Sequence, residues 1–487
     1  MNDTNAIHSG KDVNDAFRGG PRAVRFLAQI NKASIVMLAE VGIVKAGDAS
    51  RIAAGVLRLG AEDRENPRQA TADYLDYERR LTEAIGTTAS LIHAGRSRQD
   101  IASTLSRMNL RDDLLTAHEA LAKARAAAVR LAGEHRDTII PAYTHGVQAQ
   151  PTTFAHYLLA LADALGRSLE RLQEVYGRLN HCPLGAGALS TSSFPVDRDR
   201  LASLLGFAGA VDNAYDANHL APVDSALEFA AAIAVSAIQA GQFAQDLHAQ
   251  YAAPKPWATL RAGELVGISS LMPQKRNPAA LEQLRAQASL LWTAMQGPFL
   301  LAHNVRTGMF DYRAYDPLPD LKASLVFDLL RKVIDGIVVD REQALAEVDA
   351  DYSTSTEIAD VLMQDAGVPF RTGHHFASAI ADYGRTRKIS LREVPYDAAA
   401  SIYREQTGEA LPIDEAAYRA AIDPARMIRR RQGRGGPQAA EVERMLAAAR
   451  ALDIASLGWS AARRQDLQRA DDALQSQLTH LAGPEAR

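Results

Sequence analysis

The chain has 487 residues, of which 47% are hydrophobic and 23% are charged. Its 54 basic and 58 acidic side chains give a formal net charge of -4, so it lacks the basic excess that a nucleic-acid-binding protein needs. The single cysteine, Cys182, excludes a disulfide framework within the chain. This length exceeds one domain of ordinary size and predicts two or three domains.

The start and the most apolar part of the chain predict neither a secretory signal nor a membrane span. The N-terminal residues lack the basic start and apolar core of a signal. The most apolar stretch, residues 229–238, is far shorter than the roughly 20 residues that a membrane helix needs. With the single cysteine, these features predict a cytoplasmic protein.

Apolar residues at steps of three and four predict a long helix after Pro151. We expect Pro151 to begin this helix, because the N–H that proline lacks is not needed in the first turn. The apolar stripe of the helix is formed by Phe154, Tyr157, Leu158, Leu161, Leu165, Leu169, Leu172 and Val175.

Three further helices are predicted by the same criterion. Asp224 or Ser225 is the expected cap of the first, whose many alanines allow close approach of neighbours and place it in the middle of a bundle. Its expected stripe is Leu227, Ala231, Ala234 and Ile238. The second follows Pro278 and the third spans about residues 318–337. The stripe of the second is Leu281, Leu284, Ala288 and Leu291.

Strand patterns are few and short, and the remaining segments are predicted loops. The glycine- and serine-rich residues 184–195 and the residues 263–278 are two of them, and the arginine-rich residues 426–436 are expected to form an exposed turn. We place domain boundaries near residues 105 and 352. This division predicts an N-terminal helical domain (1–105), a central bundle of long helices (106–352) and a small helical C-terminal domain (353–487).

The segment GISSLMPQKRNPAALEQLR, residues 267–285, carries the most chemical information. Ser269 and Ser270 place two hydroxyls on a loop, Lys275 adds a positive charge and Asn277 adds amide donors. The helix that begins at Pro278 presents N–H groups that favour an anion. Any one of these features alone is ordinary on a surface loop, but their combination suits a substrate with carboxylates.

The whole segment closely resembles the GSSxMPxKxNP loop of the fumarase/aspartase superfamily, with Ile268 in place of a family glycine. Other segments resemble the argininosuccinate lyase branch, over about residues 73–437. They are HAGRSRQD (93–100), YTHGVQAQP (143–151), PLGAGALSTSSFPVDR (183–198), GVPFRTGHH (367–375) and RRQGRGGP (430–437).

The resemblance implies an all-α fold of three helical domains, in which the central long helices form the shared core of a homotetramer. Each active site would then take loops from three subunits, which would explain why the candidate residues lie far apart in the sequence. A cleft between two domains of one chain is the alternative. No metal-ligand cluster, phosphate loop or dinucleotide motif is present in the sequence, so we expect neither a metal nor a cofactor.

The resemblance also implies a reaction, the splitting of a C–N or C–O bond in a succinyl compound with release of fumarate. Ser269, as an alkoxide, would take the proton from carbon. Lys275 and Asn277, beside Ser270, would hold the carboxylate that takes up the charge, which must be stabilised by preorganised donors. A serine is a poor base unless nearby cations and amides stabilise its anion.

His145 and Glu282 match a family pair near the leaving group. A carboxylate behind an imidazole orients it and favours its charged form, so the pair could protonate the departing amine. By itself, His145 is more often a buried, hydrogen-bonded histidine. Its neighbours favour a functional role, since Thr144 would bind a carboxylate and Gln150 belongs to the same motif.

Ser97, Arg98 and Gln99 match family positions that bind the fumarate portion. Without the resemblance, this segment would be a solvated basic turn. Gln99 stands where the family has asparagine, and its additional methylene would place the amide deeper or turn it aside. We therefore hypothesise a reshaped substrate pocket.

The half of the site that handles the amine departs from argininosuccinate lyases. In residues 302–317, only Asn304 and Pro317 match convincingly, and His303 stands where the family has tyrosine. Tyr74 replaces a family histidine. The sequence thus predicts a C–N lyase acting on an N-succinyl amine or amino acid, for example ethylenediamine disuccinate.

Two alternatives remain. Argininosuccinate itself is the main alternative substrate. A non-catalytic structural role, as in lens crystallins of the family, is disfavoured because the candidate catalytic residues are all present, and a fumarate-sensing protein is disfavoured further.

Overall fold

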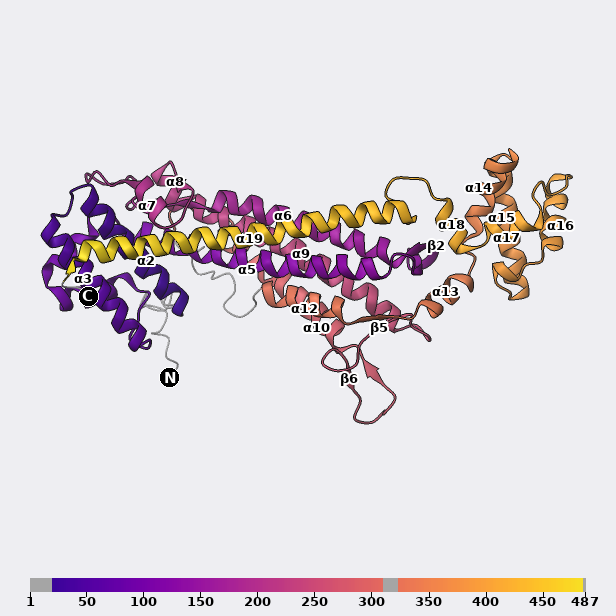
Figure 1. The fold of residues 1–487 in the computed structure, drawn as a ribbon, viewed down its shortest axis with the longest axis horizontal. Helices are drawn as coiled ribbons and strands as arrows, with labels where there is room; N and C mark the ends of the chain where they lie inside the picture. Colours follow the sequence, from indigo (N-terminus) through magenta and orange to yellow (C-terminus); the bar gives the residue numbers. More distant parts are fainter. Residues whose placement is uncertain (1–19, 310–322, 485–487) are drawn as a thin grey trace.

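The computed structural model describes residues 20–309 and 323–484, and most of them are helical. The molecule is elongated, with a bundle of long helices between two smaller groups of helices (Figure 1). The described strands form four two-stranded sheets and no larger one. The predicted all-α class is therefore confirmed.

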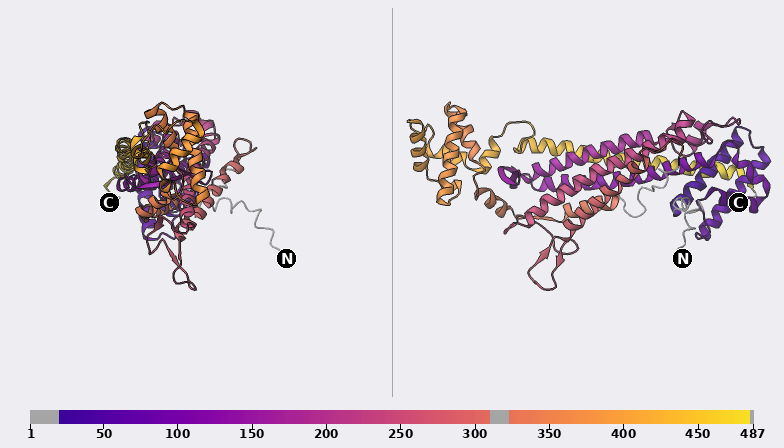
Figure 2. Two further views of the ribbon diagram at one scale, coloured as in Figure 1. Left: turned by 90° about the vertical axis from the view of Figure 1, so that its right-hand side faces the viewer. Right: turned by 180° about the vertical axis from the view of Figure 1, so that it is seen from behind.

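The central bundle consists of five helices that pack lengthwise on one another. They are α5 (Arg98–Glu134), α6 (Phe154–Leu179), α9 (Ala221–Tyr251), α10 (Ala279–Ala294) and α12 (Ala323–Asp335). Their apolar faces form the largest hydrophobic core. Views from the end and from behind show the same bundle with one hairpin projecting from its side (Figure 2).

The N-terminal end has its own core, formed mainly by α2 (Pro21–Glu40), α3 (Ala46–Glu65), α4 (Tyr74–Ile85) and η2 (Thr87–His93). The short helices α7 (Arg198–Leu204) and α8 (Ala214–His219) lie near this end, and α11 (Gln296–Ala302) follows α10 (Figure 1). The C-terminal core is formed by α14 (Ser355–Ala366), α15 (Phe370–Arg387), η4 (Leu391–Glu393), α16 (Tyr396–Thr407) and α17 (Glu415–Ala421). Helices α13 (Arg341–Asp349) and α18 (Pro424–Arg430) connect it to the bundle.

The last helix, α19 (Ala439–Ala482), returns along the bundle to the N-terminal end (Figure 1). Its first half adds Val442 and Leu446 to the central core, and its last turns add Leu474 and Leu478 to the N-terminal core. Residue 105 lies inside α5, which is continuous. The three-domain division near residues 105 and 352 therefore remains a prediction about folding units.

The four sheets are pairs of short strands. They are β1 (Ile139–Thr144) with β2 (Val147–Thr153), β3 (His181–Cys182) with β4 (Gly209–Ala210), β5 (Ala258–Leu260) with β8 (Ile337–Val339), and β6 (Gly267–Ile268) with β7 (Arg276–Asn277). Only β3 and β4 are parallel. The predicted loop at residues 184–195 has no helix or strand, whereas the loop at 263–278 contains the hairpin β6–β7.

The stripe predicted for α6 is confirmed as the face that packs into the central core. The predicted start at Pro151 is wrong, because Pro151 lies in β2 opposite Pro141. Neither proline can donate a hydrogen bond, so the pair suits a non-hydrogen-bonded position of the ladder. The helix is capped instead by Thr153, whose hydroxyl accepts the N–H of His156 at 3.2 Å.

The helix predicted with a cap at Asp224 or Ser225 begins earlier, at Ala221, with Pro222 in its first turn. That cap is wrong, since both residues lie inside α9. The predicted stripe is not the buried face either, and Ile238 is 48% exposed. The residues that α9 buries include Phe229, Ala230, Ile233, Ala237, Ala240 and Phe243.

By length and composition, α9 is the one helix in the described ranges that could cross a membrane. The prediction that no stretch is long enough for a membrane helix considered only residues 229–238. The apolar composition of α9 continues beyond that stretch. A core helix of a bundle has the same properties, and α9 packs against α6 and α10. We therefore interpret α9 as a core helix.

The helix predicted after Pro278 is confirmed as α10, and its four stripe residues are buried. The predicted start of the next helix near residue 318 lies outside the described residues, and α12 ends at Asp335, before Ile337 enters β8. The exposed turn predicted at 426–436 is wrong in part. Residues up to Arg430 belong to α18, and Arg430 and Arg431 form ion pairs with the buried Glu357 at 3.1 and 3.4 Å.

The central bundle contains a buried cation, Arg125 of α5, which is 1% exposed. Arg125 forms an ion pair with Asp453 of α19 and donates to the carbonyls of Ala162 and Ala449, each at 2.9 Å. We expect Arg125→Met to lower the free energy of unfolding by about 3–5 kcal/mol, because it leaves the buried Asp453 carboxylate without its partner and removes the second hydrogen bond of two helix carbonyls.

Urea unfolding would measure this effect, with Arg130→Met as the control. Arg130 lies on the same helix, but its ion pair with Asp335 is exposed, so its loss should cost at most about 1 kcal/mol. Equal losses for the two variants would contradict the importance of the buried pair.

Candidate active site

The hairpin β6–β7 carries Ser269 and Lys275 away from the bundle (Figure 1). Its tip packs on little within the chain, as Leu271 is 83% exposed. The hydroxyl oxygen of Ser269 accepts the N–H groups of Met272 at 3.0 Å and Leu271 at 3.4 Å. Both N–H dipoles point at Oγ, so they would stabilise negative charge there.

The other polar groups of the hairpin surround this serine in sequence. Ser270 and Lys275 are exposed, and no described residue forms an ion pair with the Lys275 ammonium. Asn277 lies half-buried in β7. The N–H groups at the start of α10 were expected to attract an anion. The N–H of Ala280 already donates to the carbonyl of Leu265 at 3.1 Å. Glu282 is exposed in the first turn of α10.

His145 lies at the tip of the hairpin β1–β2. His145 and Gly146 have φ values of 55° and 75°, and Thr144 pairs with Val147 across the two-residue turn. Positive φ at both central positions defines a type I′ turn, which follows the twist of the strands. Thr144 and His145 are consequently exposed at the end of a short, stiff hairpin.

This hairpin is fixed to its surroundings by polar side chains. Tyr143 donates to Glu347 of α13 and accepts from Gln250 of α9 at 3.1 Å. Burial and the hydrogen bond to Glu347 raise the pKa of Tyr143 above its ordinary value. Gln150 donates to the hydroxyl of Thr356 at 3.3 Å. The position of His145 is therefore set by α9, α13 and α14 together.

Ser97 is the N-cap of α5, at the opposite end of the bundle. Its hydroxyl accepts the N–H of Gln99 at 3.2 Å, and the carboxylate of Asp100 accepts the N–H of Ser97 at 2.8 Å. Asp100 also accepts the N–H groups of Gly185 and Gly187 at 2.9 and 3.0 Å. Burial raises the pKa of Asp100 to about 6, although the three N–H groups oppose this shift.

Arg98 and Gln99 follow in the first turn of α5. Arg98 is exposed, whereas the Gln99 amide donates to the carbonyl of Asn218 in α8 at 3.1 Å. The longer side chain is thus turned toward α8. Whether this reshapes the substrate pocket remains a hypothesis.

His303 and Asn304 follow α11 and are exposed. Asn304 has a φ of 59°, a left-handed conformation that asparagine tolerates. Thr307 lies 3.3 Å from the hydroxyl of Tyr215 in α8, so this segment lies near the helix that also contacts Gln99. Residues 310–317, the rest of the segment compared with the family, lie outside the described residues.

A buried cluster supports the Ser97 segment and was not recognised as such in the sequence. Tyr74 bonds to Nδ1 of His93 at 2.6 Å, and the Arg96 guanidinium lies 5.1 Å from the centroid of the Tyr74 ring. Arg96 donates to Ser34 of α2 at 2.9 Å. Burial and the charge of Arg96 lower the pKa of His93. Arg96 belongs to the GRSR motif, but its partner Ser34 precedes the region of resemblance.

One chain does not bring the candidate residues together. Ser97 begins α5, and His145 follows its other end, so the 37 residues of the helix separate them by about 55 Å. Within the described ranges, no hydrogen bond or ion pair joins His145 to Glu282. A cleft within one chain could not hold Ser97 and His145 against the same small substrate.

Metal-binding residues do not gather in the part of the chain that the structure describes. No group of three or more His, Cys, Asp or Glu side chains is placed there to hold a metal ion. Whether the protein uses a metal or cofactor stays at the level of the sequence prediction.

Comparison with known proteins agrees with the resemblance. A family model described as "Lyase" matches residues 37–290, and one described as "Argininosuccinate lyase C-terminal" matches residues 352–429. Argininosuccinate lyase 2 of Agrobacterium fabrum is 33% identical over 84% of this chain and 82% of its own length. Argininosuccinate lyase 1 of Shouchella clausii is 31% identical over 86% of each chain.

Solved structures give a second comparison. EDDS lyase in complex with formate, and a variant of EDDS lyase with bound fumarate, each superimpose with a TM-score of 0.86 and 29% identity. Each match covers 95% of this chain and 92% of the other. A class II fumarase from Schistosoma mansoni has the same fold at 15% identity, with a TM-score of 0.66.

The left-handed backbone of His145 allows its side chain to be removed without harm to the fold. We expect His145→Gly to leave the free energy of unfolding unchanged or raise it by up to about 1 kcal/mol, because glycine adopts positive φ without strain. Gly146→Val, at the other central position, should lower it by about 1 kcal/mol or more. Urea unfolding of both variants would check this, and a large loss for His145→Gly would show that the imidazole supports the fold.

Proposed function

The chain belongs to the argininosuccinate lyase branch of the fumarase/aspartase superfamily, and on this premise we propose that it removes an amine from an N-succinyl amine or amino acid, such as ethylenediamine disuccinate. It is a carbon–nitrogen lyase that releases fumarate. The proposal covers the identity of the amine, the roles of the catalytic and binding residues, the homotetramer and the cytoplasmic location. No cofactor takes part in it.

The observation that carries the choice of amine is a contrast between two halves of the candidate site. Ser269, Lys275 and Asn277 are retained on the projecting hairpin, where they suit a carboxylate. The other half departs from argininosuccinate lyases at residues 302–317 and at Tyr74, whose hydroxyl is already bound to His93. The similarity to EDDS lyase over 95% of the chain supports an amine other than arginine.

In the proposed reaction, the Ser269 alkoxide takes a proton from the carbon beside a carboxylate. The electron pair of that C–H bond moves into the carboxylate, which Lys275 and Asn277 hold. The same electron pair then forms the C=C double bond of fumarate as the C–N bond breaks. The His145 imidazolium, paired with Glu282, gives its proton to the departing amine.

Ser97, Arg98 and Gln99 bind the fumarate portion in this proposal. Thr144, Gln150 and Ser270 complete the binding of the carboxylates, and His303 and Asn304 lie on the side of the amine. These residues come from four separate parts of the chain, so the completed site depends on the proposed assembly.

We propose a homotetramer in which different subunits complete each site. The separation of about 55 Å between Ser97 and His145 supports this, because they can meet one substrate only if they come from different chains. The bundle helices also expose apolar side chains that a neighbouring chain would bury. They include Val235, Ile238, Leu290, Trp292 and Leu325.

Argininosuccinate remains the second candidate substrate, favoured by the names of relatives at 31–33% identity. A crystallin-like structural protein would have no need of a projecting hairpin with an activated serine. Release of fumarate, measured by ultraviolet absorbance, distinguishes these possibilities. We expect rapid release from ethylenediamine disuccinate and slower release from argininosuccinate.

We expect Ser269→Ala to lower kcat by a factor of about 10² to 10⁴, the usual contribution of a general base. Gln274→Ala is the matched control, because Gln274 is exposed on the same hairpin and has no role in the proposed chemistry. If only argininosuccinate reacts, the proposed amine is wrong. If Ser269→Ala keeps full activity, another residue is the base.

Mixing two inactive variants tests the shared sites. We expect Ser269→Ala and His145→Gly, unfolded and reassembled together in equal amounts, to recover about a quarter of the wild-type sites, since each residue then comes independently from either variant. Fumarate release would measure the recovery, and each variant reassembled alone is the control. Mixed tetramers without any recovery would contradict the assignment of the two residues to different subunits.

A further inference from the structure

A cavity of about 200 Å³ lies between α2, α5, α7 and α19, outside the proposed active site. Arg111 lines it and lies 14 positions after Ser97 on α5, which corresponds to about 20 Å along the helix. The side chains around it come from the beginning, the middle and the end of the chain. No residue assigned to the proposed reaction lines it.

One part of the cavity wall is apolar. Phe26, Met108 and Leu474 are buried beside it, and Leu204, Leu205 and Leu467 extend the same surface. A cavity of about 150 Å³ in another protein holds benzene, so 200 Å³ offers room for about eight or nine non-hydrogen atoms. This size fits one small molecule with a short apolar group.

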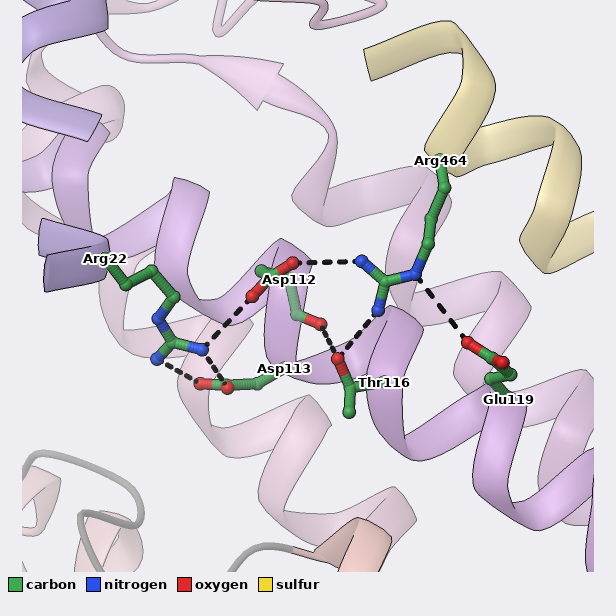
Figure 3. A network of polar contacts seen from close by, with 6 residues as sticks. All are labelled: Arg22, Asp112, Asp113, Thr116, Glu119 and Arg464. Atoms are coloured by element: carbon green, nitrogen blue, oxygen red, sulfur yellow. Dashed lines mark hydrogen bonds and ion pairs between the residues drawn. The ribbon is translucent and has the colours of Figure 1, made fainter. Parts of the chain in front are cut away.

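Two charged lining residues, Asp112 and Arg464, belong to a network of polar contacts with residues beside the cavity (Figure 3). Asp112 lies between two arginines, and accepts from Arg22 at 3.3 Å and from Arg464 at 3.1 Å. Arg464 also donates to Thr116 at 2.7 Å and lies 3.8 Å from Glu119. These contacts hold α2 and α19 against α5 and leave Asp112 and Arg464 little capacity for a ligand.

Arg111 is also occupied by the protein. It is buried and donates to Asn180 at 2.9 Å and to the carbonyls of Leu205 and Gly206 at 3.1 Å. All three acceptors are uncharged. Burial lowers the pKa of Arg111 to about 10, and the cation contributes a positive field to the cavity without a directly bound carboxylate.

Arg25 and Asp471 are the charged lining residues that keep capacity for a ligand. No described residue forms a hydrogen bond or ion pair with either of them, and the Arg25 guanidinium lies 4.8 Å from the centroid of the Phe26 ring. The carboxyl oxygen Oδ1 of Asp471 is buried without a hydrogen-bond partner. The same cavity therefore offers one available cation, one available carboxylate and an apolar wall.

We propose that this cavity binds an α-amino acid with an apolar side chain. The ligand carboxylate pairs with Arg25 in the field of Arg111, and the ligand ammonium donates to Asp471. The apolar side chain contacts the wall around Phe26. With three arginines and two aspartates, the lining has one positive charge in excess, which favours a ligand that brings a carboxylate to the arginine side.

The site is suited to an effector because its walls belong to helices that also reach the proposed active site. Helix α5 carries Asp112 and, at its start, Ser97, while α2 carries both Arg25 and Ser34, the partner of Arg96. A ligand that draws α19 toward α2 stabilises the arrangement in which Ser97 is capped. The proposal does not depend on the identity of the amine released by the enzyme.

Calorimetric titration of the full-length protein with L-leucine tests the proposal. Two analogues serve as probes of each charge: 4-methylpentanoate lacks the ammonium group, and isopentylamine lacks the carboxylate. We expect L-leucine to bind and both analogues to bind at least about tenfold more weakly. Equal binding of 4-methylpentanoate would overturn the role of Asp471, and absence of L-leucine binding would overturn the site.

Two variants with a matched control locate the binding. Asp471→Asn and Arg25→Gln should each weaken L-leucine binding by about tenfold or more, because each removes one charged partner. Asp472→Asn makes the same change at the next position, which is exposed and does not line the cavity, so it should bind as the wild type does. Unchanged binding by both Asp471→Asn and Arg25→Gln would place L-leucine elsewhere, and melting temperatures would show that all variants are folded.

Discussion

The continuity of α5 constrains how this protein can assemble a site. Its 37 residues form one rigid element, with the capped Ser97 segment at one end and the His145 hairpin after the other. Elements packed along its length cannot bring these two ends together. Subunits placed side by side in opposite directions can, and they would cover the apolar residues that the bundle leaves exposed. The long helix thereby connects the proposed chemistry to the proposed homotetramer.

Buried charges fix the positions of the elements that carry candidate residues. Asp100 holds the Ser97 segment to the loop at 184–195 through three backbone N–H groups. Arg125 plays a comparable part in the bundle, where it joins α5, α6 and α19. Because a buried charge is costly without its partners, such contacts tolerate few alternative arrangements. In contrast, the Ser269 hairpin has few contacts within the chain, which fits the proposed site shared between subunits.

The returning helix α19 connects regions that would otherwise be separate. It packs on the central core with its first half and on the N-terminal core with its last turns. Arg464, near the middle of this span, meets Asp112 of α5 in the network shown in Figure 3. The cavity beside that network is thus enclosed by helices whose relative positions also determine how the Ser97 segment is held.

Local patterns in the sequence determined α6 and α10, because an amphipathic helix records its buried face in steps of three and four residues. The loop with Ser269, Lys275 and Asn277 was recognisable because these polar residues lie within nine consecutive positions of the sequence, although its hairpin was not predicted. The start of α6 was not recognisable from the sequence, because Pro151 is placed by pairing with Pro141 in another strand. The buried face of α9 depended on which neighbours pack against it, and the support of Arg96 by Ser34 joins residues 62 positions apart. Only the tertiary structure decided these features, and above all the distance between Ser97 and His145, because contacts between remote segments leave no periodic trace in the sequence.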